Sequence, residues 1–187
     1  MAKVRLQKDT FLPMPVCLVG ANVEGRPNFQ VAAWFTQVNF KPVWIAVSLA
    51  VDHHTTRGIQ ENGSFSLCFP SRDLVAQTDY CGLVSGKDHD KSGIFKVFYG
   101  QLGTAPMADD CPFCLELKVV KQVALQGDTL VMGELVAAYG EEGLLSDGLP
   151  DPKRMELMFL TMPQNKYWTL GDEVADAYSV GKALIKE

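Results

Sequence analysis

Two strand-like runs that follow each other near the N-terminus constrain the fold of this chain more than any other feature of its sequence. The second run, 41–49, is apolar, rich in β-branched residues and bounded by a proline, so it predicts a buried β-strand. The first run, 27–34, follows a turn at Glu24-Gly25 and ends in two alanines and a tryptophan. Small side chains beside a large flat one leave backbone amides accessible next to an aromatic wall, which suits a planar ligand. The alternative is an ordinary strand pair with a core tryptophan, and the spacing alone favours that alternative.

Other strand-like segments predict that the chain is mainly β. The stretch 64–69 alternates between apolar residues, which we expect to face the core, and serines, which we expect to face solvent. Residues 113–125 and 129–138 predict a long hairpin that turns at 126–128. Antiparallel strands joined by short turns indicate a closed or partly closed β-barrel.

Only a few short helices are expected. The segment 52–59 predicts a loop that enters a short helix, and Asn62-Gly63 ends it. A second, amphipathic helix follows residue 70, with Ser71 as its expected N-cap. The sequence has no regular βαβ alternation and no G-x-G-x-x-G motif, so a Rossmann nucleotide domain is disfavoured.

The composition is that of one folded domain over residues 1–187, with no internal repeat or linker. A net charge of -5 argues against nucleic acid as a partner, because binding phosphates needs a basic face. No apolar stretch approaches the roughly 20 residues that span a bilayer, so no membrane partner is expected, and the basic first residues lack the apolar core of a signal peptide. Five cysteines without a disulfide-framework spacing fit a reducing compartment, and we expect a cytoplasmic protein.

The motif Cys111-Pro112-Phe113-Cys114 has a spacing used by redox and metal sites. A zinc site would need two more ligands at a credible spacing, and the three histidines form no second pair. Redox motifs of the thioredoxin type begin a helix, whereas the second cysteine here begins a strand. We therefore expect neither a metal site nor a reactive dithiol.

The run 27–34 and the polar stretch 85–91, Ser-Gly-Lys-Asp-His-Asp-Lys, together resemble the FMN-binding split-barrel family of flavin reductases, and most closely its flavoredoxin type. The resemblance begins near residue 13 and weakens towards residue 170. It implies an antiparallel split β-barrel of Greek-key type with FMN as cofactor. It also implies a homodimer in which the partner subunit helps to cover the flavin. Five side chains of the interface type lie near the C-terminus: Met155, Met158, Phe159, Tyr167 and Trp168.

For the FMN phosphate, the candidates are Thr55 and Lys91, with His54 and Thr56 as neighbours. Thr55 lies at a predicted helix start, where free N–H groups favour an anion. Lys91 falls on the lysine of the motif that the family shares. The alternatives are a capping threonine and a solvated loop lysine; the residues alone favour these, and the resemblance favours the phosphate site.

For the flavin ring, the candidates come from the two runs and the second hairpin: Asn28, the backbone of Val31, Ala32 and Ala33, then Trp34, Ser48, Leu49 and Asp128. Small residues at 32 and 33 allow a ring to approach the backbone. Asn28 could instead be a turn residue. Where similar sequences can carry a histidine beside a threonine, this chain has Asp128, which we expect to point away as part of the turn; otherwise its carboxylate would tune the flavin differently.

No catalytic side chain is expected, because hydride and electron transfer belong to the flavin itself. Three functional classes stay open: an enzyme that takes hydride from NADH or NADPH, a carrier that receives electrons from a redox protein, and a module that binds another planar ligand. The sequence has no fingerprint that separates the first two.

Overall fold

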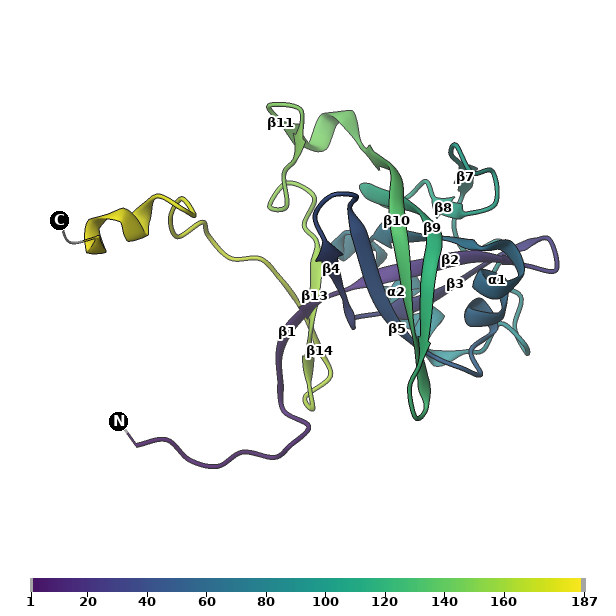
Figure 1. Cartoon of the computed structure of the whole chain (residues 1–187), viewed down its shortest axis with the longest axis horizontal. Helices are drawn as coiled ribbons and strands as arrows, with labels where there is room; N and C mark the ends of the chain where they lie inside the picture. Colours follow the sequence, from purple (N-terminus) through teal and green to yellow (C-terminus); the bar gives the residue numbers. More distant parts are fainter. Residues whose placement is uncertain (1, 186–187) are drawn as a thin grey trace.

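A seven-stranded antiparallel sheet curls around the core in this computed structural model, which describes residues 2–185 (Figure 1). Its strands, in spatial order, are β3 (Arg26–Ala32), β2 (Cys17–Val23), β6 (Ser64–Phe69), β9 (Phe113–Ala124), β10 (Asp128–Gly140), β5 (Trp44–Ala50) and β4 (Phe35–Asn39). The two edge strands, β3 and β4, are consecutive in the chain, so the sheet must curl to bring its edges together. The Ser48 amide donates to the Trp34 carbonyl at 2.9 Å near this seam. Within the described residues no strand ladder joins β3 to β4, which makes the fold a split barrel.

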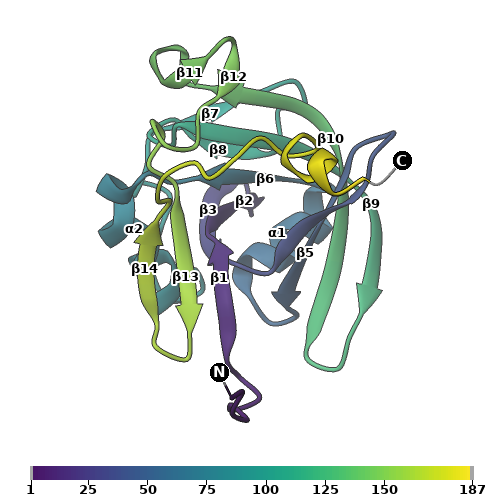
Figure 2. The same ribbon diagram turned by 90° about the vertical axis from the view of Figure 1, so that its left-hand side faces the viewer.

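A separate three-stranded sheet lies beside the barrel (Figure 2). It consists of β1 (Phe11–Pro15), β13 (Met158–Met162) and β14 (Lys166–Thr169). The shorter elements are β7 (Val97–Tyr99), β8 (Pro106–Ala108), β11 (Leu145–Ser146) and β12 (Leu149–Pro150), with 3-10 turns η1 (Arg72–Leu74), η2 (Glu142–Leu144) and η3 (Val180–Leu184). Residues 170–185, which we name the C-terminal arm, leave the body of the molecule on the side of β1 and β13 (Figure 1).

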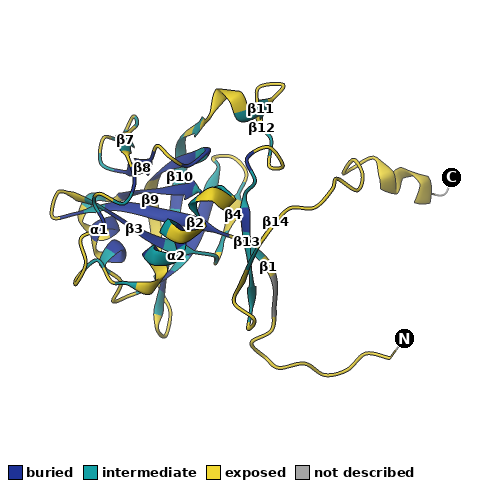
Figure 3. Ribbon diagram, turned by 180° about the vertical axis from the view of Figure 1, so that it is seen from behind, coloured by how far each residue is buried: buried dark blue, intermediate teal, exposed yellow. Residues whose placement is uncertain are grey.

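The buried residues, drawn dark blue in Figure 3, belong to two clusters. Alternate residues of β2 and β6 divide between them, so the clusters lie on opposite faces of the curled sheet. The first fills the barrel with alternate side chains from five strands, such as Val19, Val47 and Leu117. The second lies between β2, β3, β6 and the segment that contains β8, and it includes four of the five cysteines. The mainly β prediction is confirmed, and most predicted strands lie where the patterns placed them.

The expectation that the serines of 64–69 face solvent is wrong. Ser64 and Ser66 are both buried, because the β8 segment covers the outer face of β6. The Ser66 hydroxyl donates to the Pro106 carbonyl, and the Ser64 hydroxyl bonds that of Thr104 at 2.7 Å. Alternating polarity thus predicts that a strand has two different faces, but it does not predict which segment of the chain covers the outer face.

The capping prediction for Ser71 is confirmed in position only: Ser71 is the N-cap residue of η1, but its side chain makes no capping hydrogen bond. The Ser71 carbonyl instead accepts from the Leu74 amide at 3.0 Å and starts the 3-10 turn η1 before α2 (Val75–Leu83).

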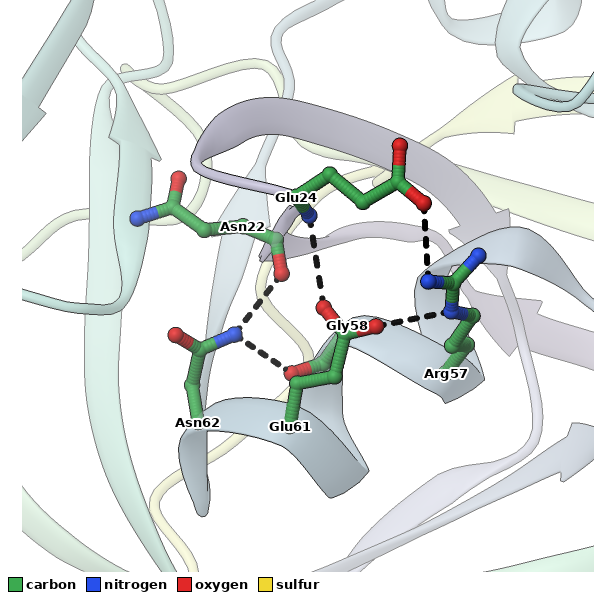
Figure 4. Close-up of polar contacts among 6 residues, drawn as sticks. All are labelled: Asn22, Glu24, Arg57, Gly58, Glu61 and Asn62. Carbon is green, nitrogen blue, oxygen red and sulfur yellow. Dashed lines mark hydrogen bonds and ion pairs between the residues drawn. The ribbon is translucent and has the colours of Figure 1, made fainter.

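The helix α1 (His54–Asn62) is fixed tightly against the β2–β3 hairpin (Figure 4). The Asn62 amide donates to the carbonyls of Asn22, at 2.8 Å, and Gly58, at 2.7 Å. Arg57 donates to the Glu24 carboxylate at 2.8 Å across the same contact. A Cβ at Gly58 would collide with the Asn22 carbonyl, so the close approach requires glycine there. These contacts set where the N-terminus of α1 points.

A buried carboxylate fixes a second loop. Glu116 on β9 is fully buried and accepts from the backbone amides of Gln101 and Leu102, each at 2.8 Å. The Tyr139 hydroxyl donates to the same carboxylate at 3.2 Å. Burial, and then the neighbouring Glu116 carboxylate, raise the pKa of Tyr139. The arrangement satisfies all the groups involved, as a buried charge requires.

Candidate functional site

Three adjoining pockets lie along β3, where the barrel is split. The middle pocket, about 270 Å³, shares Gln30, Val31 and His53 with an apolar pocket of about 240 Å³. On its other side it shares Asn28 and Lys91 with an outer polar pocket of about 520 Å³. Together they form one cleft with an apolar end and a polar end.

The N-terminus of α1 faces the middle pocket. Its N-cap residue, His53, gives no side-chain capping bond, and the first turn carries no acidic residue. The first N–H groups of a helix have no partner within it, so this end favours an anion. Thr55 is 1% exposed, and its hydroxyl oxygen accepts from the Asn28 amide at 2.6 Å. Two of the predicted site residues are therefore in direct contact across the pocket.

Lys91 reaches the same pocket from the other side and is only 3% exposed. Its ammonium donates to the carbonyl of Phe29 on β3 at 3.1 Å and to that of Cys81 on α2 at 2.9 Å. Burial lowers the pKa of Lys91. An ammonium has three N–H donors, and two are used here. The solvated-lysine alternative is wrong, because this side chain supports both the edge strand and the end of a helix.

The loop after α2 closes the middle pocket at Gly86. A Cβ at this position would collide with the side chains of Asn28 and His54. Glycine therefore allows the loop to approach both candidate residues. Thr56 is buried as well, but its hydroxyl donates to the Ala50 carbonyl at 2.9 Å, and it does not line the pockets described here.

The apolar pocket contains most of the residues predicted for the ring. Its wall includes Ala32, Ala33 and Trp34, with Ser48 and Leu49 from β5. Trp34 is 50% exposed, so it lies at the pocket mouth and is not part of the barrel core. The interpretation of Trp34 as a core residue is therefore wrong.

The prediction that Asp128 points away from the site as a turn residue is wrong. It is the first residue of β10 and pairs with Ala50, which places its side chain diagonally next to Ser48. The Ser48 hydroxyl donates to its carboxylate at 3.1 Å, and both side chains line the apolar pocket. The turn itself is made by residues 126–127, and Asp128 closes it through its own carbonyl, which accepts from the Leu125 amide at 2.9 Å.

Sequence reasoning missed the wall that the three-stranded sheet provides. Leu160 and Met162 of β13 and Tyr167 of β14 line the apolar pocket. The Tyr167 hydroxyl donates to the Asp79 carboxylate of α2 at 2.9 Å, which fixes β14 in place. Burial, followed by the Asp79 carboxylate, raises the pKa of Tyr167 to about 12. The aromatic and apolar residues near the C-terminus are the available signal, but from the sequence we predict a subunit interface for them. For Met155 and Met158 that prediction is wrong, because both are buried within the chain.

The Cys111/Cys114 pair lies outside the cleft. It lines a separate pocket of about 200 Å³ together with Phe98 and Tyr139. Burial is the main cause that raises the pKa of Cys111, while the contact with Cys68 and burial raise that of Cys114. Within residues 2–185 no group of three or more His, Cys, Asp or Glu side chains is arranged to hold a metal ion. In the same part of the chain, no helix is both long and apolar enough to cross a membrane.

Comparison with known proteins identifies the family. Residues 10–160 match the profile of the Flavin reductase like domain. The crystal structure of flavoredoxin from Methanosarcina acetivorans superimposes with a TM-score of 0.96 at 46% identity, over 99% of this chain and 100% of that one. Flavoredoxin of Desulfovibrio vulgaris (Miyazaki F) gives 0.90 at 33% identity, over 97% and 100%. An FMN-binding protein from Thermus thermophilus, solved with bound 1-cyclohex-2-enone, gives 0.80 at 26%, over 94% and 99%. This chain belongs to the flavin reductase-like family and is similar to flavoredoxins over nearly its whole length.

Proposed function

We propose that this protein binds FMN in the cleft along β3 and transfers electrons through it. The observation that carries the proposal is the middle pocket. There a buried ammonium, a buried hydroxyl and an uncapped helix N-terminus face one space that adjoins an apolar pocket. A ligand that fits both ends needs an anionic group and a flat apolar ring, and FMN has both.

The phosphate belongs in the middle pocket. Lys91 provides the positive charge and its third N–H donor, and the first turn of α1 provides free backbone N–H groups. Thr55, held by Asn28, is within the same wall. Charge-assisted hydrogen bonds of this kind are about twice as strong as neutral ones.

The ring belongs in the apolar pocket. Small side chains at Ala32 and Ala33 leave the strand backbone open to it, and Trp34 and Tyr167 provide aromatic walls. When bound, FMN supplies the hydride and electron transfer. This chain's residues position the cofactor and set its electrostatic surroundings, and none of them needs to act as acid, base or nucleophile.

Calorimetry with FMN, FAD and riboflavin tests the assignment. We expect about one FMN per chain, because the middle and apolar pockets adjoin and together offer one place for a phosphate and one for a ring. Riboflavin lacks the phosphate and should bind more weakly by about 1.5–3 kcal/mol, the range for hydrogen bonds to charged groups. FAD carries a substituted phosphate and should also bind less tightly. Equal affinity for FMN and riboflavin would remove the phosphate from the middle pocket.

We further propose NADH or NADPH as the electron donor; the alternative is a tightly held FMN that exchanges electrons with a redox protein. An anaerobic titration followed by the visible spectrum separates the two. Rapid bleaching of the bound flavin by either nucleotide supports the reductase. A flavin that both nucleotides leave oxidised, but that a chemical reductant bleaches, supports the carrier.

A homodimer is part of the proposal. The C-terminal arm carries apolar side chains with high exposure, such as Tyr178 at 98% and Val174 at 96%, and Trp168 beside it is 56% exposed. Exposed apolar surface of this extent is typical of an interaction site. Light scattering should give twice the chain mass, and a monomer at micromolar concentration would contradict the proposal. A cytoplasmic location stays a prediction from the sequence.

A further inference from the structure

One carboxylate lies in the wall of the otherwise apolar pocket. Asp128 accepts a hydrogen bond of 3.1 Å from the Ser48 hydroxyl, and Leu49, Ala50 and Met162 are among the other residues that line the pocket. Most of the surface of this pocket is apolar. A negative charge in such surroundings acts strongly on any group that changes its charge nearby, because little water is present to screen it.

We propose that Asp128 disfavours the anionic form of the reduced flavin, so that the ring takes up two protons with two electrons at neutral pH and its midpoint potential is lowered. This inference rests on the proposed function, since it requires a flavin in the apolar pocket. It assigns Asp128 the role of a positioning residue, which changes the midpoint potential through its charge and exchanges no proton with the ring.

The place of Asp128 in the pocket wall sets the scale of this effect. Because its side chain lines the pocket, we take a separation of about 8 Å between the carboxylate and a ring bound there. At this separation, with the effective dielectric constant of about 20 that fits most protein sites, two like charges repel by more than thermal energy. The population of an anionic ring is expected to fall about ten- to thirtyfold.

The other titratable groups at this pocket do not cancel the charge of Asp128. Tyr167, with its pKa raised to about 12, is neutral near neutral pH and donates to Asp79 outside the pocket. His53 lies at the exposed mouth, where the apolar and middle pockets meet, and its imidazolium would act with the opposite sign. Lys91 lines only the middle and outer pockets. The strands β5 and β9 place Ser48, Ala50 and Ala124 next to Asp128, and none of these is charged.

The number of protons taken up on reduction makes the inference measurable. Two electrons from a reductant and two protons from solvent convert the oxidised ring into the neutral reduced ring. Two electrons and one proton give the anionic reduced ring instead. The midpoint potential therefore falls about twice as steeply with pH below the reduced ring's pKa as above it. The pH at which the slope changes reports the charge that surrounds the ring.

The test is a potentiometric titration of the FMN-loaded protein between pH 5.5 and 9.5 with a dye-mediated chemical reductant. Asp128→Asn keeps the shape and can still bond Ser48, but it removes the charge. We expect the change of slope to move down by about one pH unit and the potential at high pH to rise by about 30 mV, a tenfold change for a two-electron couple. The near-ultraviolet absorbance of the reduced protein, followed against pH, gives the same transition independently.

Glu134→Gln is the matched control. Glu134 lies six residues further along β10, about 20 Å away, where it accepts from the Trp44 indole N–H at 3.3 Å. This variant removes the same charge from the same strand and should titrate like the wild type. The His53→Gln variant removes the imidazole at the pocket mouth. Adding Asp128→Asn to this variant should shift the transition by the same amount as it does in the wild type.

The outcomes of these titrations distinguish a failure of the inference from a failure of the proposed function. A transition in Asp128→Asn that matches the wild type, with FMN bound, overturns the inference and leaves the proposed function intact. A shift of the same size in Glu134→Gln overturns it as well, because the effect would then be one of net charge. A wild-type protein that takes up no flavin overturns the proposed function, and the inference with it.

Discussion

Replacing Lys91 with methionine should weaken both the apo-protein and its binding of FMN, by separate amounts. Methionine keeps an unbranched side chain of similar length and removes only the ammonium. Two hydrogen bonds are lost, to the Phe29 and Cys81 carbonyls, and each is worth about 1.5–3 kcal/mol because the donor is charged. Removing a buried charge offsets part of this loss, since the burial that lowers the pKa of Lys91 is itself unfavourable. We expect the free energy of unfolding of the apo-protein to fall by about 2–4 kcal/mol.

The effect on FMN binding can be measured separately from the effect on stability, because only the phosphate interacts with the charge of Lys91. FMN affinity should fall about 10- to 100-fold, which corresponds to about 1.4–2.8 kcal/mol. Riboflavin, which has no phosphate, should bind the variant and the wild type alike. Urea denaturation of the apo-proteins gives the first quantity, and calorimetry with the two flavins gives the second.

Lys87→Met is the control, because Lys87 is an exposed lysine in the same loop and lines only the outer polar pocket. It should change neither quantity by more than about 0.5 kcal/mol, as is usual for surface substitutions. The reasoning is refuted if Lys91→Met weakens riboflavin as much as FMN. That result would assign Lys91 to the fold alone.

Four further predictions follow from the same structure. Trp34→Ala should speed FMN release and shift the flavin spectrum while apo-protein melting changes little, because this side chain is half exposed; a large loss of apo stability with an unaltered spectrum would contradict this. The double variant Cys111→Ser and Cys114→Ser, loaded with FMN, should keep its rate of flavin reduction, because both thiols have raised pKa values and line a separate pocket; a folded variant with bound FMN that no longer accepts electrons would refute this. Glu116→Gln should lower the free energy of unfolding by about 1–3 kcal/mol in urea, because an amide has one acceptor oxygen for two backbone donors; an unchanged midpoint would rule this out. FMN affinity should fall as the pH rises through the lowered pKa of Lys91, since the phosphate prefers the charged form and raises that pKa on binding, and in Lys91→Met this pH dependence should be absent.

Most strands of the seven-stranded sheet and both α-helices could be predicted from the sequence because they depend on local patterns. Alternation over 64–69 and the apolar run 41–49 both correspond to strands. What covers a strand depends on residues far along the chain, and the sequence pattern does not contain that information. Ser66 is buried because the segment around residue 106 packs over it, which no local rule predicts.

The candidate site shows the same division. Thr55 and Lys91, both predicted for the phosphate, line the middle pocket, and Asn28, predicted for the ring, lines that pocket instead of the apolar one. The structural role of Lys91, which links β3 to α2, depends on a contact between residues 62 positions apart and could not be read from its loop. Asp128 was misjudged because a turn residue and the first residue of a strand look alike in sequence, and only the register with Ala50 decides which way the side chain points.

The free edge of β3 has a consequence for how this cleft can vary among proteins. Because Phe29 turns its carbonyl outward to Lys91, the two-residue period of a strand directs the backbone groups of Val31 to the same side. Peptide groups are identical for nearly every amino acid, so the binding of a ligand that hydrogen-bonds to this edge is insensitive to most substitutions there. Proline is the exception, since it removes the N–H. Hydrogen bonds to the main chain would allow the side chains around the cleft to differ among proteins while the ligand stays bound in the same way. Those side chains could then determine which partner reacts with the bound group.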